Sequence, residues 1–152
     1  NKIHLAIGVG SRLGSNARRH LFDKFSAAGF QFPPLVHPTA YVATDARLGP
    51  GVQIMAGAIV QSGSEFASCS IANTRSSIDH ECNVGAFAHV APGATLCGCV
   101  SIGANSFVGP GAVITHNLTI GAEAIVGAGS VVLRDVPPAA TLWGIPAQSR
   151  HT

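Results

Sequence analysis

Residues 77–93, SIDHECNVGAFAHVAPG, gather ionisable side chains in a chain whose Asp, Glu, Lys and Arg make up only 11% of the sequence. Asp79, His80 and Glu81 are adjacent, and His89 follows nine residues after His80. Histidine titrates near neutral pH and serves as a general base, and a neighbouring carboxylate can orient its ring. The segment therefore predicts a site where a base and its orienting acid act together.

The composition places this site in one domain. A chain of 152 residues, of which 47% are hydrophobic, has enough apolar side chains for a core, and 18 Gly and 9 Pro predict many tight turns. No segment has the roughly 18 apolar residues of a membrane span, and the start NKIHLAIGVGSR lacks a signal-peptide pattern. We therefore expect a cytoplasmic protein that binds no membrane and, because its net charge of +2 is dispersed, no nucleic acid.

A six-residue repeat must position the ionisable groups. Every sixth residue from Val36 to Val132 is apolar, and the positions four residues later are mostly small. This period fits neither an α-helix nor a long alternating strand, but it fits a short strand followed by a corner. Pairs such as Pro50-Gly51, Pro92-Gly93 and Pro110-Gly111 supply the turn residues. Three strands close a coil of 18 residues, so the sequence predicts a mainly β protein, a parallel β-helix with coils about 4.8 Å apart.

The repeat resembles the [LIV]-G-x-x-x-x motif of the hexapeptide-repeat acyltransferases, which occurs here as IGANSF, VGPGAV and IGAEAI. The resemblance implies a left-handed coil, against the usual right-handed crossover rule. The closing RDVPPAATLWGIPAQ is similar to the segment after the last coil of these enzymes, with GIPAQ in place of G-x-P-A-K. We expect a left-handed β-helix over residues 36–134 and, over residues 135–152, a cap that covers the open β-edge and in which Trp143 packs.

Residues 1–35 do not follow the period. IHLAIGVG predicts a buried strand, and SNARRHLFDKFSAAGF predicts an amphipathic helix with Leu21, Phe22 and Phe25 toward the core. The chain resembles bacterial sialic-acid O-acetyltransferases and UDP-4-amino-sugar N-acetyltransferases, whose α/β domain precedes the β-helix and binds the nucleotide-sugar. The resemblance implies that this short partial α/β unit is a remnant of that domain without its opening G-A-G-G-H-G motif, and that Gly8 contacts the sugar nucleotide.

His80 and Glu81 are the second and third residues after the apolar Ile78, where other corners have Pro-Gly. Neighbouring side chains at a corner can both project outward, so a hydrogen bond between His80 and Glu81 is feasible. The family motif assigns the general base to His80 and its carboxylate partner to Glu81. Gly98 lies one coil beyond His80 in the same column, and the stacking together with the family suggests its backbone N–H as an oxyanion donor.

The resemblance also implies the donor and the assembly. His89 lies on a strand and points outward from another face, so the two histidines diverge within one chain. A homotrimer, the usual assembly of the family, supplies a neighbouring subunit that can bring His89 and His80 together. The family match places acetyl-CoA against His89, with the rest of the coenzyme near Pro110, Gly127 and Ala128.

These features predict an acetyl-CoA-dependent acetyltransferase without a metal, acting on an amino or hydroxyl group of a nucleotide-linked sugar in bacterial surface-glycan biosynthesis. Two alternatives stay open. One is a non-catalytic trimeric scaffold or CoA-binding protein that has lost its sugar site. The other is a γ-carbonic-anhydrase type of zinc enzyme, but His80, His89 and His116 lack that family's closely spaced pair. The four cysteines form no C-x-x-C pair and are expected in the core.

Overall fold

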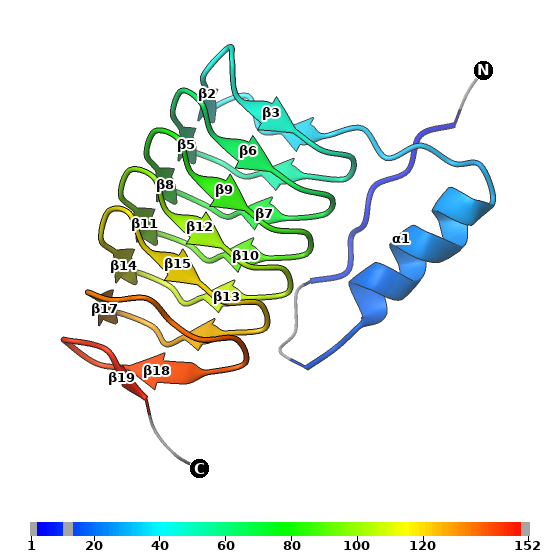
Figure 1. Ribbon diagram of the computed structural model, residues 1–152. Helices are drawn as coiled ribbons and strands as arrows, with labels where there is room; N and C mark the ends of the chain where they lie inside the picture. Colours follow the sequence, from blue (N-terminus) through cyan, green and yellow to red (C-terminus); the bar gives the residue numbers. More distant parts are fainter. Residues whose placement is uncertain (1–2, 11–13, 150–152) are drawn as a thin grey trace.

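The structure is a computed structural model that describes residues 3–10 and 14–149. Helix α1 (Ala17–Ala27) precedes a prism of short strands, and Figure 1 shows the strands stacked along the prism with α1 beside it. Strands three apart in sequence are neighbours in one sheet, and their registers differ by 18 residues, as in Leu35 opposite Gln53. The predicted left-handed parallel β-helix is confirmed.

Three sheets form the faces of the prism, and all their pairings are parallel except that of β18 with β19. The eight-stranded sheet contains, in order, β1 (Leu35–Val36), β4 (Gln53–Ile54), β7 (Ile71–Ala72), β10 (His89–Val90), β13 (Phe107–Val108), β16 (Ile125–Val126), β18 (Thr141–Trp143) and β19 (Gln148–Ser149). The six-stranded sheet contains β17 (Val131–Val132), β14 (Val113–Ile114), β11 (Thr95–Leu96), β8 (Ser77–Ile78), β5 (Ile59–Val60) and β2 (Tyr41–Val42). The five-stranded sheet contains β15 (Thr119–Ile120), β12 (Ser101–Ile102), β9 (Asn83–Val84), β6 (Glu65–Phe66) and β3 (Arg47–Leu48).

The core is a column of apolar side chains inside the prism. The second residue of each strand points inward, and from Ile54 to Val132 these residues are at most 3% exposed. Each such burial contributes about 2 kcal/mol, so the column is the main source of stability. Val36 is 45% exposed, because it lies in the first coil and has a neighbouring coil on one side only.

The corners share one backbone conformation whatever their sequence. From Gly51 to Gly129, every sixth residue has a positive φ between 55° and 71°. Six of these fourteen residues are glycine, and the others include Glu81 and Cys99. A non-glycine residue in this left-handed region costs about 1 kcal/mol, so these corners are held by the hydrogen bonds of the stacked coils rather than by turn propensity.

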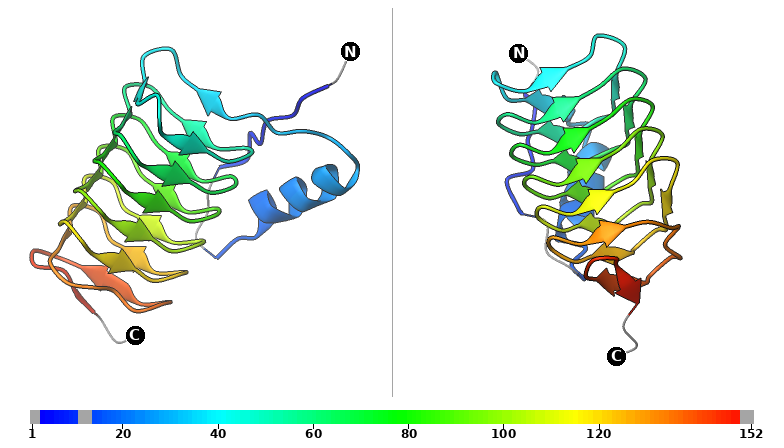
Figure 2. Two further views of the ribbon diagram at one scale, coloured as in Figure 1. Left: turned by 45° about the horizontal axis from the view of Figure 1, so that its top comes forward. Right: turned by 90° about the vertical axis from the view of Figure 1, so that its left-hand side faces the viewer.

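Segment 3–10 runs along the eight-stranded sheet, as the views of Figure 2 show, and Nε2 of Gln53 donates to the carbonyl of Ile7 at 2.9 Å. The predicted strand does not form here. The segment makes one isolated bridge, between His4 and Gln31, and Ile7 is its one buried residue. The segment lies against the outer face of the sheet rather than beside a strand edge, so its backbone cannot form a ladder.

Helix α1 packs through an aromatic cluster, as predicted. Phe22 and Phe25 contact the buried group formed by Ile7, Phe32 and Cys69, while Leu21 is half-buried outside this cluster. The helix ends at Ala27, and Gly29, with a φ of +86° and an N–H bond to the Ser26 carbonyl, closes the last turn. With eleven residues, α1 is too short to cross a membrane, and no other helix occurs in the described residues.

The C-terminal segment adds two strands to the end of the eight-stranded sheet. Strand β18 pairs with β16 after a coil of 16 residues, and β19 folds back against β18. Leu142 and Ala147 are 5% exposed and join the core. The indole of Trp143 lies against Gly127, where a Cβ would overlap it. The division into residues 1–35, 36–134 and 135–152 stays a prediction.

Candidate active site

His80 and Glu81 lie at the corner between β8 and β9. Nδ1 of His80 is 3.0 Å from Oε2 of Glu81, which is the hydrogen bond expected from the sequence. A carboxylate only accepts, so Nδ1 carries the ring proton and Nε2 keeps a free lone pair. The side chain of His80 is 55% exposed, so this lone pair is accessible to a substrate. Asp79 plays a separate part, because its Oδ1 accepts from the backbone N–H of His80 at 2.8 Å.

The backbone of this corner is braced by a buried hydroxyl. Oγ of Ser64 donates to the carbonyl of Asp79 at 2.9 Å and accepts from the N–H of Cys82 at 3.2 Å. At the corner of residues 91–94, by contrast, the N–H of the fourth residue donates directly to the carbonyl of the first at 3.2 Å. The serine therefore holds open the corner that carries His80, and it comes from the coil before.

Gly98 lies directly beneath the His80 ring. A Cβ at this position would be 2.5 Å from both Cε1 and Nε2 of His80, so the ring can rest there only because the residue is glycine. The N–H of Gly98 has no acceptor in the described part of the chain. The carbonyl of Cys97, which shares a peptide plane with this N–H, accepts from Sγ of Cys82 at 3.2 Å, and the Gly98 carbonyl accepts from the N–H of Asn117 at 3.0 Å. The structure thus brings His80, Glu81 and Gly98 together.

Glu81 occupies the left-handed position of its corner, with a φ of 57°. Gly63, one coil earlier, leaves room for it, since a Cβ there would be 3.1 Å from Cγ of Glu81. Cys99, one coil later, donates its thiol to Oε2 of Glu81 at 3.6 Å. Desolvation and this hydrogen bond raise the pKa of the Cys99 thiol. Sequence reasoning missed Cys99, although the 18-residue register places it beside Glu81.

His89 has different surroundings on β10. Nδ2 of Asn73 donates to its Nε2 at 3.0 Å, an orientation fixed by the bond between Oδ1 of Asn73 and the N–H of Thr74. Nδ1 of His89 has no partner in the described residues, and the ring packs edge-on against Phe107. Burial, aided by the positive charge of Arg18, lowers the pKa of His89 to about 4. His89 and His80 lie on different sides of the prism, as expected from the sequence.

The other predicted contact residues lie elsewhere. Pro110 is at a corner between the eight- and six-stranded sheets, and its carbonyl accepts from the N–H of Gly129 in the next coil. Gly127 and Ala128 belong to that next coil, and Gly127 lies under the Trp143 indole. Gly8 is exposed, with open space where a side chain would be. The structure does not bring Gly8 or these corner residues next to His80, and their roles stay predictions.

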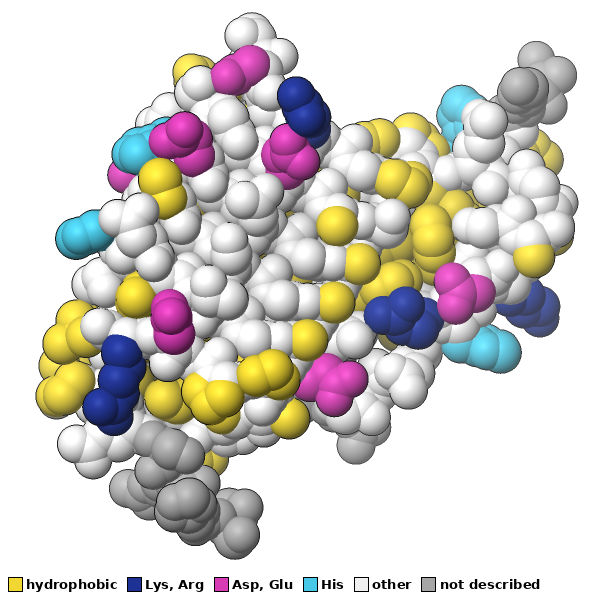
Figure 3. Space-filling model, viewed as in Figure 1, with side chains coloured by type: hydrophobic (Ala, Val, Ile, Leu, Met, Phe, Trp, Pro, Cys, Tyr) yellow, Lys and Arg dark blue, Asp and Glu magenta, His cyan; other side chains and the backbone are white. Residues whose placement is uncertain are grey.

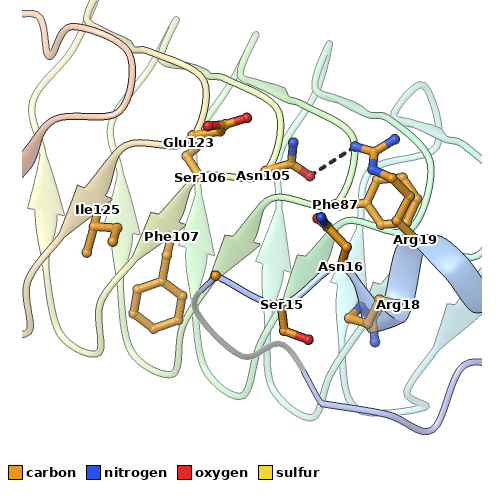
Figure 4. A pocket seen from close by; sticks show the side chains of 11 residues that line it. Ser15, Asn16, Arg18, Arg19, Phe87, Asn105, Ser106, Phe107, Glu123 and Ile125 are labelled. Carbon is orange, nitrogen blue, oxygen red and sulfur yellow. Dashed lines mark hydrogen bonds between the residues drawn. The ribbon is translucent and has the colours of Figure 1, made fainter.

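A cavity of about 370 Å³ lies between the start of α1 and the eight-stranded sheet (Figure 4). Its lining includes Arg18, Arg19, Phe107 and Glu123. Figure 4 shows Arg19 directed toward Asn105, whose Oδ1 accepts from Nη2 at 3.0 Å. This hollow lies over another face of the prism than the His80 corner.

Figure 3 shows how the side-chain types are distributed. Hydrophobic side chains gather between the β-helix and the helical unit, while histidine and acidic side chains meet on the opposite edge of the prism. Two of the four cysteines, Cys69 and Cys82, are buried as expected. Cys97 and Cys99 are only half-buried, so the prediction that all four fill the core is wrong for these two, which lie at a corner.

One group of three ligand-type side chains occurs in the described chain. His80, Glu81 and Cys99 place their ligand atoms within 4.8 Å of one another. The carbonic-anhydrase alternative needs three histidines, and this group contains one.

The sequence and the fold of this chain are similar to those of known bacterial transferases. The sequence profile of the bacterial transferase hexapeptide family (six repeats) matches residues 99–134. The acetyltransferase domain of PglB from Neisseria gonorrhoeae is 37% identical, with a TM-score of 0.93 over 97% of this chain and 70% of that one. PerB from Caulobacter crescentus, solved with CoA and GDP-perosamine, is 38% identical, with the same TM-score and coverage. WeeI from Acinetobacter baumannii is 28% identical, with a TM-score of 0.86 over 91% of this chain and 68% of that one.

Proposed function

This chain belongs to the hexapeptide-repeat acyltransferases, and we propose that it transfers the acetyl group of acetyl-CoA to the amino group of a nucleotide-linked sugar. The observation that carries the proposal is the exposed His80 ring, with Nδ1 bound to Glu81 and Nε2 free. The similarity to PglB, solved with acetyl coenzyme A, supports the donor. The similarity to a perosamine N-acetyltransferase, solved with CoA and GDP-perosamine, supports an amino-sugar acceptor.

In the proposed reaction, Nε2 of His80 removes a proton from the acceptor amine as the nitrogen attacks the thioester carbonyl. Glu81 keeps the ring in the tautomer that has its lone pair on Nε2 and stabilises the imidazolium that forms. The tetrahedral intermediate then collapses with loss of the coenzyme A thiolate, which takes the proton back from His80. No metal takes part in these steps.

The developing negative charge on the carbonyl oxygen needs a hydrogen-bond donor. The N–H of Gly98 is suited to this role because it has no acceptor in the described chain and lies beneath the His80 ring. A donor fixed by the coil ladder costs no reorganisation when the charge appears. The base and the oxyanion donor are thereby held on successive coils of one corner.

The acetyl donor, acetyl-CoA, is expected to lie along the corners that carry Pro110, Gly127 and Ala128. His89 is expected to contact acetyl-CoA, and a homotrimer would supply the neighbouring subunit that brings His89 and His80 together, since the two histidines of one chain diverge. The role of Gly8 toward the nucleotide-sugar belongs to the same proposal. Each of these assignments rests on the family resemblance.

Calorimetric titration with acetyl-CoA, followed by a thiol-release assay, tests the proposal. The acceptors are GDP-perosamine and UDP-4-amino sugars, with the matching 4-hydroxy sugars as controls. Turnover with the amino sugars alone supports N-acetylation, and turnover with the hydroxy sugars alone replaces it with O-acetylation. Binding of acetyl-CoA without turnover favours a protein that has lost its sugar site, and no binding favours a scaffold.

A further inference from the structure

His80, Glu81 and Cys99 offer three different ligand atoms on one exposed corner. Nδ1 of His80 and Sγ of Cys99 lie 3.0 Å and 3.6 Å from Oε2 of Glu81. Zinc bonds to such atoms are about 2.0–2.3 Å long, so ligand atoms around a tetrahedral ion lie about 3.3–3.7 Å apart. We propose that these three side chains form a zinc-binding site, with water as the fourth ligand.

The backbone fixes the ligands relative to one another. Glu81 and Cys99 occupy equivalent left-handed positions of two stacked corners, with φ values of 57° and 60°. The N–H of Cys99 donates to the carbonyl of His80 at 2.9 Å, which ties the two corners together. The three ligand atoms lie within 4.8 Å of one another, so closing the site around an ion needs only side-chain rotation. The side chains of His80 and Glu81 are 55% and 68% exposed, which leaves an open path for the ion.

The ligand types favour zinc over magnesium and calcium. A thiolate and an imidazole suit zinc, whereas magnesium and calcium prefer a full set of oxygen ligands. The carboxylate of Asp79 beside His80 adds negative charge close to the site. Three protein ligands leave the fourth position to water, as in open zinc sites and unlike a closed four-ligand structural site.

Zinc at this position inhibits the proposed acetyl transfer. The metal takes the lone pair of Nδ1, so the ring proton moves through solvent from Nδ1 to Nε2, and the Cys99 thiol releases its proton to the buffer. Nε2 then donates a hydrogen bond instead of accepting a proton, and Glu81 no longer orients the ring. This inhibition rests on the proposed function, while the binding of the ion does not.

Titration of the metal-free full chain with Co²⁺ tests the binding. We expect one ion per chain, with a thiolate-to-cobalt absorption band that Zn²⁺ displaces. Cys99→Ser should lose the band and weaken zinc binding at least about tenfold, since a neutral hydroxyl is a poor zinc ligand. The matched control is Cys97→Ser, which changes another half-buried thiol two residues away and should keep the band. No band in the natural chain, or an unchanged band in Cys99→Ser, overturns the site.

The thiol-release assay tests the inhibition. Zn²⁺ should lower turnover of the natural chain and of Cys97→Ser, and a chelator should restore it. Cys99→Ser, compared with its own metal-free rate, should need at least about tenfold more Zn²⁺ for the same inhibition. Equal sensitivity of the two variants overturns the inhibitory role of this site. A metal-free chain without turnover contradicts the proposed function instead, and the cobalt band still decides on the site.

Discussion

His80 and His89 are nine residues apart and have opposite surroundings. His80 lies at a corner, about half exposed, with Nδ1 bound to Glu81 and Nε2 free. His89 lies within the eight-stranded sheet, 9% exposed, with Nε2 bound to Asn73. Its pKa of about 4 makes it neutral at neutral pH. Corners of the prism project side chains into solvent, whereas this face is covered by the N-terminal unit, so position in the coil decides whether a histidine can react.

The largest expected effect is on turnover at the exposed histidine. His80→Ala removes the base, and we expect turnover to fall by about 10²–10⁴-fold in the thiol-release assay. His116→Ala is the matched control, because His116 is exposed in the same corner column two coils later. Both variants should unfold within about 0.5 kcal/mol of the natural chain, since neither ring is buried. Equal turnover of the two variants would contradict the role of His80 as the base.

The buried histidine should instead control stability at low pH. Its folded pKa of about 4 lies below the unfolded value of about 6.5, so the unfolded chain binds more protons between these values. The stabilising contribution is complete above about pH 6.5 and is lost as the pH falls toward 4, by about 2 kcal/mol at pH 5. Denaturant unfolding at pH 7 and pH 5 measures the loss. His89→Gln should lose less, and the same loss in both proteins would assign it to other groups.

A substitution at Gly98 tests whether the close contact beneath the His80 ring is needed for turnover. Gly98→Ala places a Cβ 2.5 Å from Nε2 of His80, so the ring must turn away. We expect turnover to fall by about 10- to 100-fold, because a reacting atom is displaced by about 1 Å. Gly93→Ala is the control, since a Cβ there meets no atom within 4 Å. It should cost about 1 kcal/mol of stability through its φ of 68°, with turnover unchanged.

The smallest expected effect is on stability at Glu81, where a substitution should change stability and turnover in opposite directions. Glu81→Gly relieves a side chain in the left-handed region, so the free energy of unfolding should rise by up to about 1 kcal/mol while turnover falls. Arg75→Gly relieves the same conformation, with a φ of 55°, at a corner without a proposed role. It should gain similar stability and keep full turnover. Thermal unfolding and the thiol-release assay measure both, and a stability loss in Glu81→Gly alone would assign Glu81 to structure.

The structure of the β-helix could be predicted because each of its coils repeats the same pattern of buried and exposed residues. A six-residue period fixes the inward residues, and the 18-residue coil places any two residues of one column in contact. This 18-residue register predicted that Gly98 lies beneath His80. The contact between Glu81 and Cys99 could have been predicted from the same register. The left-handed φ at Glu81 was not evident, because turn propensity indicates glycine there and the stacked coils override it.

The irregular part could not be predicted in the same way. The burial of His89 depends on the N-terminal unit that lies against its face, and Arg18 is 71 positions earlier in the sequence, at no multiple of the period. The apolar residues of segment 3–10 indicated a strand, but a strand needs a partner, and the described chain supplies only Gln31 as a bridge. Contacts between units of different architecture leave no periodic signal.

The constant length of the coil decides which insertions of residues this fold can accommodate. An insertion of 18 residues adds one coil, lengthens the prism by about 4.8 Å and leaves every later side chain on its own face. An insertion of one residue turns each later inward side chain outward, and an insertion of six moves each later strand to the next face. Changes in length that leave the His80 corner in its place on the prism are therefore confined to whole coils. The chemistry of a corner can be carried through such changes intact.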